Sequence, residues 1–294
     1  MLSAEEKNRY QRHISLDGVG EEGQLRLKSA SVLVIGAGGL GCPVLQYLAA
    51  AGVGRMGIID NDHVEVSNLQ RQVLFGVDDV GKSKAEVARL KLLTLNPNCD
   101  VKAYPFRLDV ENAISLISEY DLVIDGSDNF PTRYLVNDAC IIANTPFVFG
   151  AIFKYEGQVS VFNFEKGPSY RCLHPTPPQN GQVPNCSEVG VLGVLPGVIG
   201  SMMANECLKM ILGIGEVLSG KMVSMDLLNN RTRTVNFERN AANFNRTSLD
   251  DSYELRREEF AAEISAKELA ELLEQETVQL IDVRETFEYE ICAI

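Results

Sequence analysis

The sequence has no tryptophan, only three histidines, and no C-x-x-C pair among its seven cysteines. No uninterrupted apolar run approaches the roughly 18 residues that a membrane-spanning helix needs, so no membrane span is predicted. Residues 1–7 (MLSAEEK) are charged and lack the apolar core of a signal peptide, so we expect a cytoplasmic protein. Disulfides are not expected in that compartment, and most of the thiols are expected to be buried as small apolar groups.

Basic residues are scarce as well. The 294-residue chain carries 27 Lys and Arg against 40 Asp and Glu, which gives a formal net charge of −13. No nucleic-acid partner is therefore expected, because a phosphate backbone requires a basic face. The hydrophobic fraction of 45% and the charged fraction of 23% are typical of an ordinary globular protein and argue against extended disorder.

The order of the predicted elements indicates the fold class. Apolar or β-branched runs alternate with helical patterns up to residue 149, and alternating polarity begins at residue 158. The expected strands are 31–35, 55–60, 122–125 and 147–149, and the expected helices are 40–51, 84–95 and 133–143. This order predicts an α/β fold with a Rossmann-like, doubly wound, mostly parallel sheet that is extended by antiparallel strands. A helix rich in small residues over 197–212 is expected to pack closely.

The composition changes beyond residue 240. Residues 240–259 are polar and charged, so we expect a linker over 241–262 that separates a first domain over 1–240 from a segment over 263–294. A capping box at 265–268 predicts a helix, and residues 278–283 predict a strand. About 30 residues cannot bury a core of their own, so this segment is interpreted as the start of a second domain.

A glycine-rich loop joins the first predicted strand to the helix that follows. It contains Gly36, Gly38, Gly39 and Gly41, which let the backbone approach an anion at the start of a helix. Asp60 ends the second predicted strand, 19 residues after Gly41, where a carboxylate can accept hydrogen bonds from ribose hydroxyls. These features predict a nucleotide site and leave NAD, FAD and ATP open.

The polar residues that follow favour a triphosphate. Arg71 lies in the block SNLQRQ over 67–72, and Lys84 lies in the first turn of the next predicted helix. Two cations near a phosphate loop suit a triphosphate better than a nicotinamide. Asp128 follows another strand, at the sheet edge where ligands bind, and a carboxylate there suits Mg²⁺ that is shared with phosphates. Either cation alone would be interpreted as solvated surface charge, and the combination with Asp128 reverses that interpretation.

Four motifs resemble the ThiF/MoeB/HesA family of adenylating enzymes, which are related to ubiquitin-activating enzymes. They are GAGGLGCP (36–43), IIDNDHVEVSNLQRQ (58–72), VGKSKAE (80–86) and DGSDNFPTRYLVND (125–138), within a resemblance that covers roughly residues 5–240. The resemblance implies ATP and Mg²⁺ as cofactors, with Asp128 as the Mg²⁺ ligand. It also implies a homodimer in which Arg12 reaches the phosphates in the partner subunit. The candidates for ATP binding are Arg12, Gly36, Gly38, Gly39, Gly41, Asp60, Asp62, Ser67, Asn68, Leu69, Gln70, Arg71, Gln72, Lys84, Asp128 and Asn129.

The resemblance further implies a reaction and a partner. Family members adenylate the C-terminal glycine of a small ubiquitin-like sulfur carrier, for molybdopterin synthesis, thiamine synthesis or tRNA thiolation. The catalytic candidates are Arg71, Lys84, Asp128 and Cys186. The two cations and the metal would stabilise charge on the phosphoryl oxygens, and no general base is needed because a carboxylate is already ionised. Cys186 aligns with a thiol that can take the acyl group as a thioester or persulfide partner, and an inert loop thiol is the alternative.

Two segments depart from the relatives' pattern. Ser169 replaces the first cysteine of a zinc-binding C-x-x-C that would end at Cys172, and no cysteine is present near 240–245, where the second pair is expected. One ligand of four cannot hold tetrahedral zinc, so zinc is predicted to be absent. Residues 280–285 resemble the opening of a rhodanese-like domain, but the chain ends before the position of its active-site cysteine, and Cys292 lies in the wrong segment. Sulfur transfer within one chain is therefore not expected, and a separate sulfur donor stays open as a partner.

Two other function classes compete with this interpretation. An NAD(P)-dependent oxidoreductase could use the same glycine loop, but no catalytic His/Lys or Tyr/Lys pair is evident. A non-catalytic scaffold that binds ubiquitin-like proteins could keep the fold alone. Both alternatives are weaker because neither needs Arg71, Lys84 and Asp128 together.

Overall fold

The computed structural model describes residues 1–178, 190–254 and 265–274. The chain divides into two compact units, Met1–Leu255 and Arg256–Ile294. In the second unit the described part is α10 (Ala266–Glu274), which begins with the predicted capping box: Ser265 N donates to Glu268 Oε2, and Ser265 Oγ accepts from Glu268 N. No helix in the described ranges is both long and apolar enough to cross a membrane.

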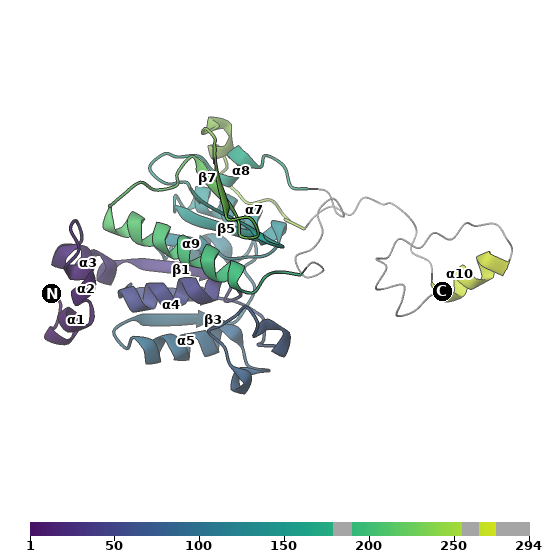
Figure 1. Ribbon diagram of the computed structural model, residues 1–294. Coiled ribbons are helices and arrows are strands. Elements are labelled where there is room, and N and C mark those ends of the chain that lie inside the picture. Colours follow the sequence, from purple (N-terminus) through teal and green to yellow (C-terminus); the bar gives the residue numbers. More distant parts are fainter. Residues whose placement is uncertain (179–189, 255–264, 275–294) are drawn as a thin grey trace. The chain divides into compact units, whose positions relative to one another are not determined.

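An eight-stranded sheet forms the centre of the first unit, in the order β3-β2-β1-β4-β5-β6-β7-β8 (Figure 1). The first five strands in this order are parallel, and β6, β7 and β8 join antiparallel. The strands are β1 (Ser31–Ile35), β2 (Arg55–Ile59), β3 (Asp100–Tyr104), β4 (Leu122–Asp125), β5 (Phe147–Phe153), β6 (Glu156–Phe162), β7 (Lys221–Asp226) and β8 (Arg231–Asn236). The predicted fold class is therefore confirmed.

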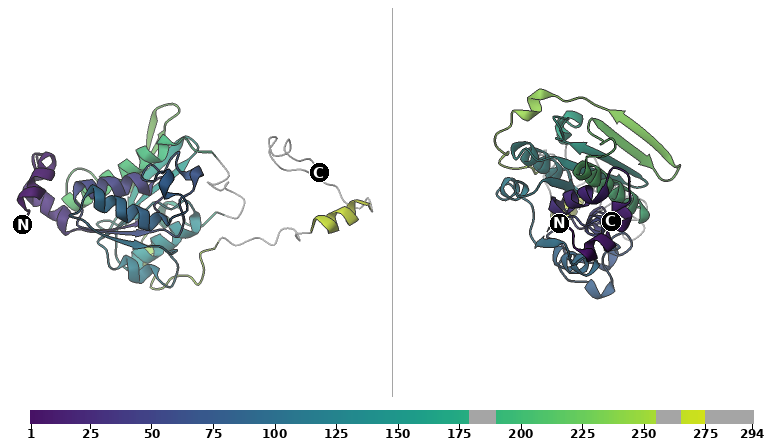
Figure 2. Two further views of the ribbon diagram at one scale, coloured as in Figure 1. Left: turned by 90° about the horizontal axis from the view of Figure 1, so that it is seen from below. Right: turned by 90° about the vertical axis from the view of Figure 1, so that its left-hand side faces the viewer.

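Helices cover both faces of this sheet (Figures 1 and 2). On one face α4 (Gly41–Ala51), α5 (Lys84–Leu95) and α9 (Val194–Leu212) bury apolar side chains in one hydrophobic cluster. On the other face α6 (Ala113–Ile117), α7 (Phe130–Ile142) and α8 (Tyr170–Leu173) contribute to a second cluster. Neighbouring residues of a strand point to opposite faces, so β1 supplies Val34 to the first cluster and Leu33 to the second.

Shorter elements complete the unit. The N-terminal helices are α1 (Ala4–Arg9), α2 (Gln11–Ile14) and α3 (Gly20–Ser29), and the 3₁₀ turns are η1 (Val66–Asn68), η2 (Val77–Asp79) and η3 (Ala241–Phe244). The close packing expected of the 197–212 helix is present in α9, where a Cβ on Gly200 would lie 2.4 Å from the Leu40 carbonyl oxygen. Strand β3 was not expected, because only two of its five residues are buried and its sequence DVKAY lacks an apolar run.

The first part of the segment that was expected to be a linker packs within the first unit. Leu249 and Tyr253 lie against the second hydrophobic cluster, and Tyr253 Oη donates to Oδ2 of the buried Asp138 over 2.7 Å. Arg246 Nε lies 3.3 Å from the same carboxylate oxygen. We call residues 240–254 the C-terminal strap. Its anchoring side chains are separated by polar residues, so composition alone indicated a linker, whereas the compact unit runs to Leu255. The rhodanese-like interpretation of 263–294 stays a prediction.

Candidate active site

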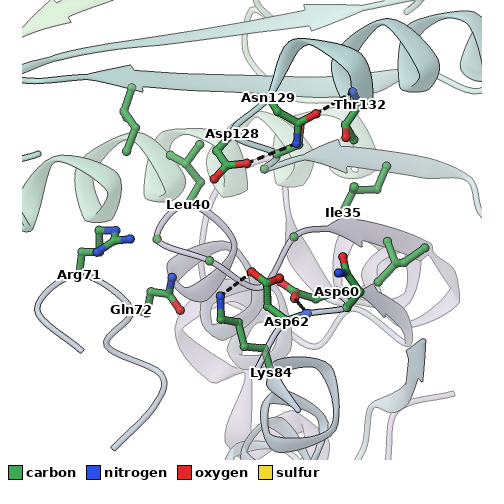
Figure 3. Close-up of a pocket in the computed structure, with 18 of the residues that line it drawn as sticks. Ile35, Leu40, Asp60, Asp62, Arg71, Gln72, Lys84, Asp128, Asn129 and Thr132 are labelled. Atoms are coloured by element: carbon green, nitrogen blue, oxygen red, sulfur yellow. Dashed lines mark hydrogen bonds and ion pairs between the residues drawn. The ribbon is translucent and has the colours of Figure 1, made fainter. Parts of the chain in front are cut away.

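A cavity of about 580 Å³ opens at the carboxyl ends of the central parallel strands (Figure 3). Its lining contains residues at the ends of β1, β2 and β5, and residues that follow β3 and β4. Chain connections leave β1 and β4 toward opposite faces of a doubly wound sheet, so a crevice opens between these two strands. The cavity therefore lies where an α/β sheet of this kind binds its ligand.

The glycine loop forms the part of the cavity next to β1. Gly36 has a φ of 88°, and a Cβ there would lie 3.1 Å from the Gly126 carbonyl oxygen. A Cβ on Gly41, where α4 begins, would lie 1.9 Å from the Gly36 carbonyl oxygen. The backbone at these two positions excludes any side chain, so the loop keeps its N–H groups close to the cavity.

Asp60 lies at the end of β2 and holds the turn that follows. Its Oδ2 accepts from Ala37 N over 2.7 Å, and its Oδ1 accepts from Asp62 N over 2.8 Å. Burial raises the pKa of Asp60 above its ordinary value, and these two backbone hydrogen bonds offset only part of that rise. The carboxylate is thereby fixed at the rim of the cavity next to the glycine loop (Figure 3).

Two cations approach the loop from different segments. The side chain of Lys84, in the first turn of α5, is 6% exposed and lies 2.9 Å from Asp62 Oδ2. Arg71 Nη1 donates to the Ser67 carbonyl oxygen over 3.1 Å, and its guanidinium faces the cavity (Figure 3). Both cations are thus oriented by described partners and line the same cavity as the glycine loop.

Asp128 and Asn129 follow β4 on the other side of the loop. Asn129 Oδ1 accepts from Thr132 N over 2.9 Å and caps α7, while Asn129 Nδ2 approaches Asp128 Oδ1 at 3.4 Å. The Asp128 side chain is exposed and faces the cavity (Figure 3). An exposed carboxylate beside a phosphate-type loop, with Oδ2 outside this hydrogen bond, can bind a metal ion.

Most of the predicted site residues line this cavity. They are Gly36, Gly38, Gly39, Asp60, Asp62, Gln70, Arg71, Gln72, Lys84, Asp128 and Asn129. Gly41, Ser67, Asn68 and Leu69 are not in the described lining, and the Asn68 side chain instead accepts from Glu65 N in η1. Arg12 is exposed on α2 and is not in the lining either. Cys186 lies outside the described residues.

Several residues of the lining were not predicted from the sequence. Ser127, Thr132 and Arg133 lie inside the motif 125–138, and the first turn of a helix after a sheet strand was a usable signal for the last two. Residues 106–108 and 152–154 also line the cavity. They follow β3 and end β5 at positions where no glycine or charge pattern marked them.

Cys172 occupies the place where the sequence suggested a degenerate zinc site. Its Sγ accepts from Asn240 N over 3.2 Å and from Asn243 Nδ2 over 3.5 Å, and it lies 3.4 Å from Ser169 Oγ. Desolvation raises the pKa of this thiol, but the hydrogen bonds of Ser169 and Asn240 outweigh it and lower the pKa below its ordinary value. The described residues contain no group of three metal-ligating side chains. The absence of zinc stays a prediction.

These features define a class of protein first. A glycine loop at the start of a helix, with two cations and a carboxylate at the switch point of a parallel sheet, is typical of nucleotide-binding α/β proteins. Residues 10–245 match the model of the ThiF family. The chain therefore belongs to the ThiF family.

Named relatives agree with this assignment. The chain is 57% identical over 241 residues to the sulfur carrier protein adenylyltransferase of Thermus thermophilus, covering 80% of this chain and 89% of that protein. It is 45% identical over 310 residues to the probable adenylyltransferase/sulfurtransferase MoeZ of Mycobacterium tuberculosis, covering 100% of this chain and 78% of MoeZ. Among solved structures, Escherichia coli MccB with ATP is similar at a TM-score of 0.70 and 26% identity, covering 81% of this chain and 73% of MccB.

Proposed function

We propose that this chain adenylylates the C-terminal glycine of a ubiquitin-like sulfur carrier protein, using ATP and releasing pyrophosphate. The observation that carries the proposal is the placement of Arg71, Lys84 and Asp128 around one glycine loop in one cavity. The relatives named sulfur carrier protein adenylyltransferase and MoeZ support the reaction and the substrate. The similarity to MccB with ATP supports the nucleotide.

The cavity suggests which of its residues bind the ribose and which bind the phosphates of the nucleotide. Asp60, fixed by Ala37 N and Asp62 N, is positioned to accept from the ribose hydroxyls. The glycine loop and the start of α4 offer N–H groups to the phosphates. The polar block over 67–72 adds Gln70, Arg71 and Gln72 beside them.

The chemical step needs charge stabilisation rather than proton transfer. An oxygen of the carrier carboxylate attacks the α-phosphorus, the bond between that phosphorus and the bridging oxygen breaks, and pyrophosphate leaves with the electron pair. Negative charge grows on the phosphoryl and leaving oxygens, and Arg71 and Lys84 are placed to bind it. One preorganised donor of this type contributes about 10²–10³ to the rate.

Mg²⁺ fits Asp128 better than it fits Asp60. The Asp128 carboxylate is exposed to the cavity, whereas both oxygens of Asp60 already accept backbone N–H groups. When bound with ATP, the metal would neutralise phosphate charge and favour departure of pyrophosphate. This chain's contribution is the Asp128 carboxylate, held beside the Asn129 amide.

Two further parts of the proposal concern other molecules. Arg12 is exposed and outside the cavity lining, so we assign it to the phosphates of a second copy in a homodimer. Cys186 is assigned to the later thioester or persulfide step. The molybdopterin, thiamine and tRNA-thiolation carriers are the substrates to compare.

The experiment is exchange of labelled pyrophosphate into ATP, catalysed by the full chain with each recombinant carrier in turn. The proposal expects exchange that requires Mg²⁺ and a carrier with a free C-terminal carboxylate. Exchange without any carrier, or none with every carrier, would contradict it. Calorimetric titration with NAD separates the oxidoreductase alternative, since micromolar NAD binding without ATP binding would favour that class.

A further inference from the structure

Two side chains that line the cavity contain buried polar atoms without a hydrogen-bond partner among the described residues. They are Gln72 Oε1 and Arg133 Nε. A buried polar atom left unpaired costs about 1–3 kcal/mol, so such atoms beside a cavity indicate groups that a ligand completes. Gln72 belongs to the polar block assigned to the phosphates, whereas Arg133 has no role in the proposed function so far.

Arg133 is a rigidly held cation with an unused donor. It lies in the first turn of α7 and is 7% exposed. Its guanidinium carbon lies 5.1 Å from the centre of the Phe130 ring and 5.5 Å from that of Phe149. Its Nη2 reaches the Ser127 carbonyl oxygen only at 3.4 Å, and its Nε has no partner in the described part of the chain. The aromatic rings therefore hold a guanidinium that lines the cavity and keeps at least one donor, Nε, without a described partner.

The nearby carboxyl of Asp125 does not fill this capacity. Asp125 is buried, its Oδ1 accepts from Ser127 N over 3.0 Å, and its Oδ2 has no partner among the described residues. Burial raises the pKa of Asp125 above its ordinary value, and the hydrogen bonds of Ser127 and the charge of Arg133 offset only part of that rise. Arg133 thus balances the buried charge from a distance while its Nε stays free for another acceptor.

The position of Arg133 identifies that acceptor. Asp60 and the glycine loop lie at β2 and β1, and Arg133 lies beyond them on the β4–β5 side, next to Phe149 of β5. A nucleotide whose ribose is at Asp60 and whose phosphates are at the loop occupies the first half of the cavity. The second half, lined by Arg133, Ile152 and Phe153, is left for the group that attacks the α-phosphorus.

We infer that Arg133 binds the C-terminal carboxylate of the carrier by donating to the oxygen that does not attack. This inference rests on the proposed function and names the residue that selects its acyl substrate. During the step the attacking oxygen bonds to the α-phosphorus, pyrophosphate takes the negative charge away, and the second oxygen becomes the carbonyl of the acyl adenylate. Arg133 stays protonated throughout, and no proton is transferred.

The test compares Arg133→Met with the conservative Arg133→Lys and with Arg55→Met as a matched control. Arg55 also stacks on an aromatic ring, 4.6 Å from the centre of Tyr120, but at the opposite end of the parallel strands. For each protein we would measure the dissociation constant of Mg-ATP alone and the carrier KM and kcat of pyrophosphate exchange. We would also measure binding, with a non-hydrolysable ATP analogue, of a carrier that supports exchange and of the same carrier with a C-terminal amide.

Arg133→Met is expected to raise the carrier KM at least about tenfold, the loss of one charge-assisted hydrogen bond, with Mg-ATP affinity changed less than about twofold. It should also abolish the preference for the free carboxylate over the amide, Arg133→Lys should restore part of that preference, and Arg55→Met should leave all values as in the wild type. If Arg133→Met keeps the carboxylate preference, or loses Mg-ATP affinity in parallel, the inference is overturned while the proposed function stands. If the wild type exchanges pyrophosphate with no carrier, the proposed function fails and the inference fails with it.

Discussion

Two regions of the first unit bury polar groups in opposite ways. At the cavity, Gln72 and Arg133 each contain a buried polar atom without a described partner. Where the C-terminal strap meets α7, the fully buried Asp138 accepts from Arg171 Nε and Tyr253 Oη, each over 2.7 Å. Buried polar side chains thus lack partners in one region and have all their partners in the other.

The difference distinguishes residues that bind a ligand from residues that stabilise the fold. A saturated network contributes to folding and leaves nothing for a ligand, whereas an incomplete one costs stability until a ligand completes it. Cys172 belongs to the saturated kind, because Asn240 N and Asn243 Nδ2 both donate to its Sγ. We therefore expect changes at the strap to lower stability and changes at the cavity to lower activity.

Asp138→Asn should have the largest effect on folding. The change leaves Arg171 and Arg246 without their buried counter-charge, and breaking such a pair costs about 3–5 kcal/mol. Urea unfolding of the full chain, followed by circular dichroism, measures the loss. A change below about 1 kcal/mol would show that the network does not hold the strap, because surface-like values of that size are typical of exposed pairs.

Asp128→Asn should show the opposite pattern. We expect carrier-dependent pyrophosphate exchange to fall at least about 10²-fold, because the phosphate charge loses its metal ligand. The free energy of unfolding should change by less than about 0.5 kcal/mol, since the side chain is exposed. Asp78→Asn, an exposed aspartate in η2 outside the cavity lining, is the matched control and should retain full exchange.

Tyr253→Phe should have a smaller effect at the strap. It removes one donor to Asp138 and leaves those of Arg171, so about 1–2 kcal/mol of stability should be lost. The same unfolding experiment measures it, and pyrophosphate exchange below the melting transition should equal that of the wild type. Loss of exchange in the folded variant would show that the strap affects activity at the cavity. That result would contradict the distinction between the two regions.

The smallest expected effect is on the rate at which the Cys172 thiol is alkylated. Its lowered pKa gives it more thiolate near neutral pH than the other described cysteines, whereas burial raises the pKa of Cys99 to about 11 and that of Cys42 to about 12. Iodoacetamide at pH 7.5 should therefore alkylate Cys172 before Cys99 and Cys42, as resolved by peptide mass spectrometry. Asn243→Ala should slow this alkylation by removing a donor to the sulfur, and an unchanged rate would refute the stabilisation of the thiolate.

The sequence predicted the parts of this structure that repeat a strong local pattern. The four buried strands, the glycine loop and the Arg71, Lys84 and Asp128 set were all expected, because apolar runs, glycines and charges are visible one segment at a time. The strap was not expected, because Arg246 and Tyr253 are recognisable as anchors only from their contacts with Asp138, which is distant from them in the sequence.

Arg133 was missed for a related reason. Its charge alone is compatible with a solvated surface residue. Its importance comes from burial between two aromatic rings and from the missing partner of its Nε. An unpaired donor is a property of the packed structure, and no spacing rule along the chain reports it.

The central claim is that the cavity joins AMP to the C-terminal carboxylate of a carrier. Intact-protein mass spectrometry of a sulfur carrier, after incubation with the full chain, Mg²⁺ and ATP, tests it most directly. The account predicts a carrier species heavier by one AMP group, formed by the wild type and absent with Asp128→Asn. A carrier that stays unmodified while the wild type consumes ATP, or an adduct that forms equally with Asp128→Asn, would contradict it.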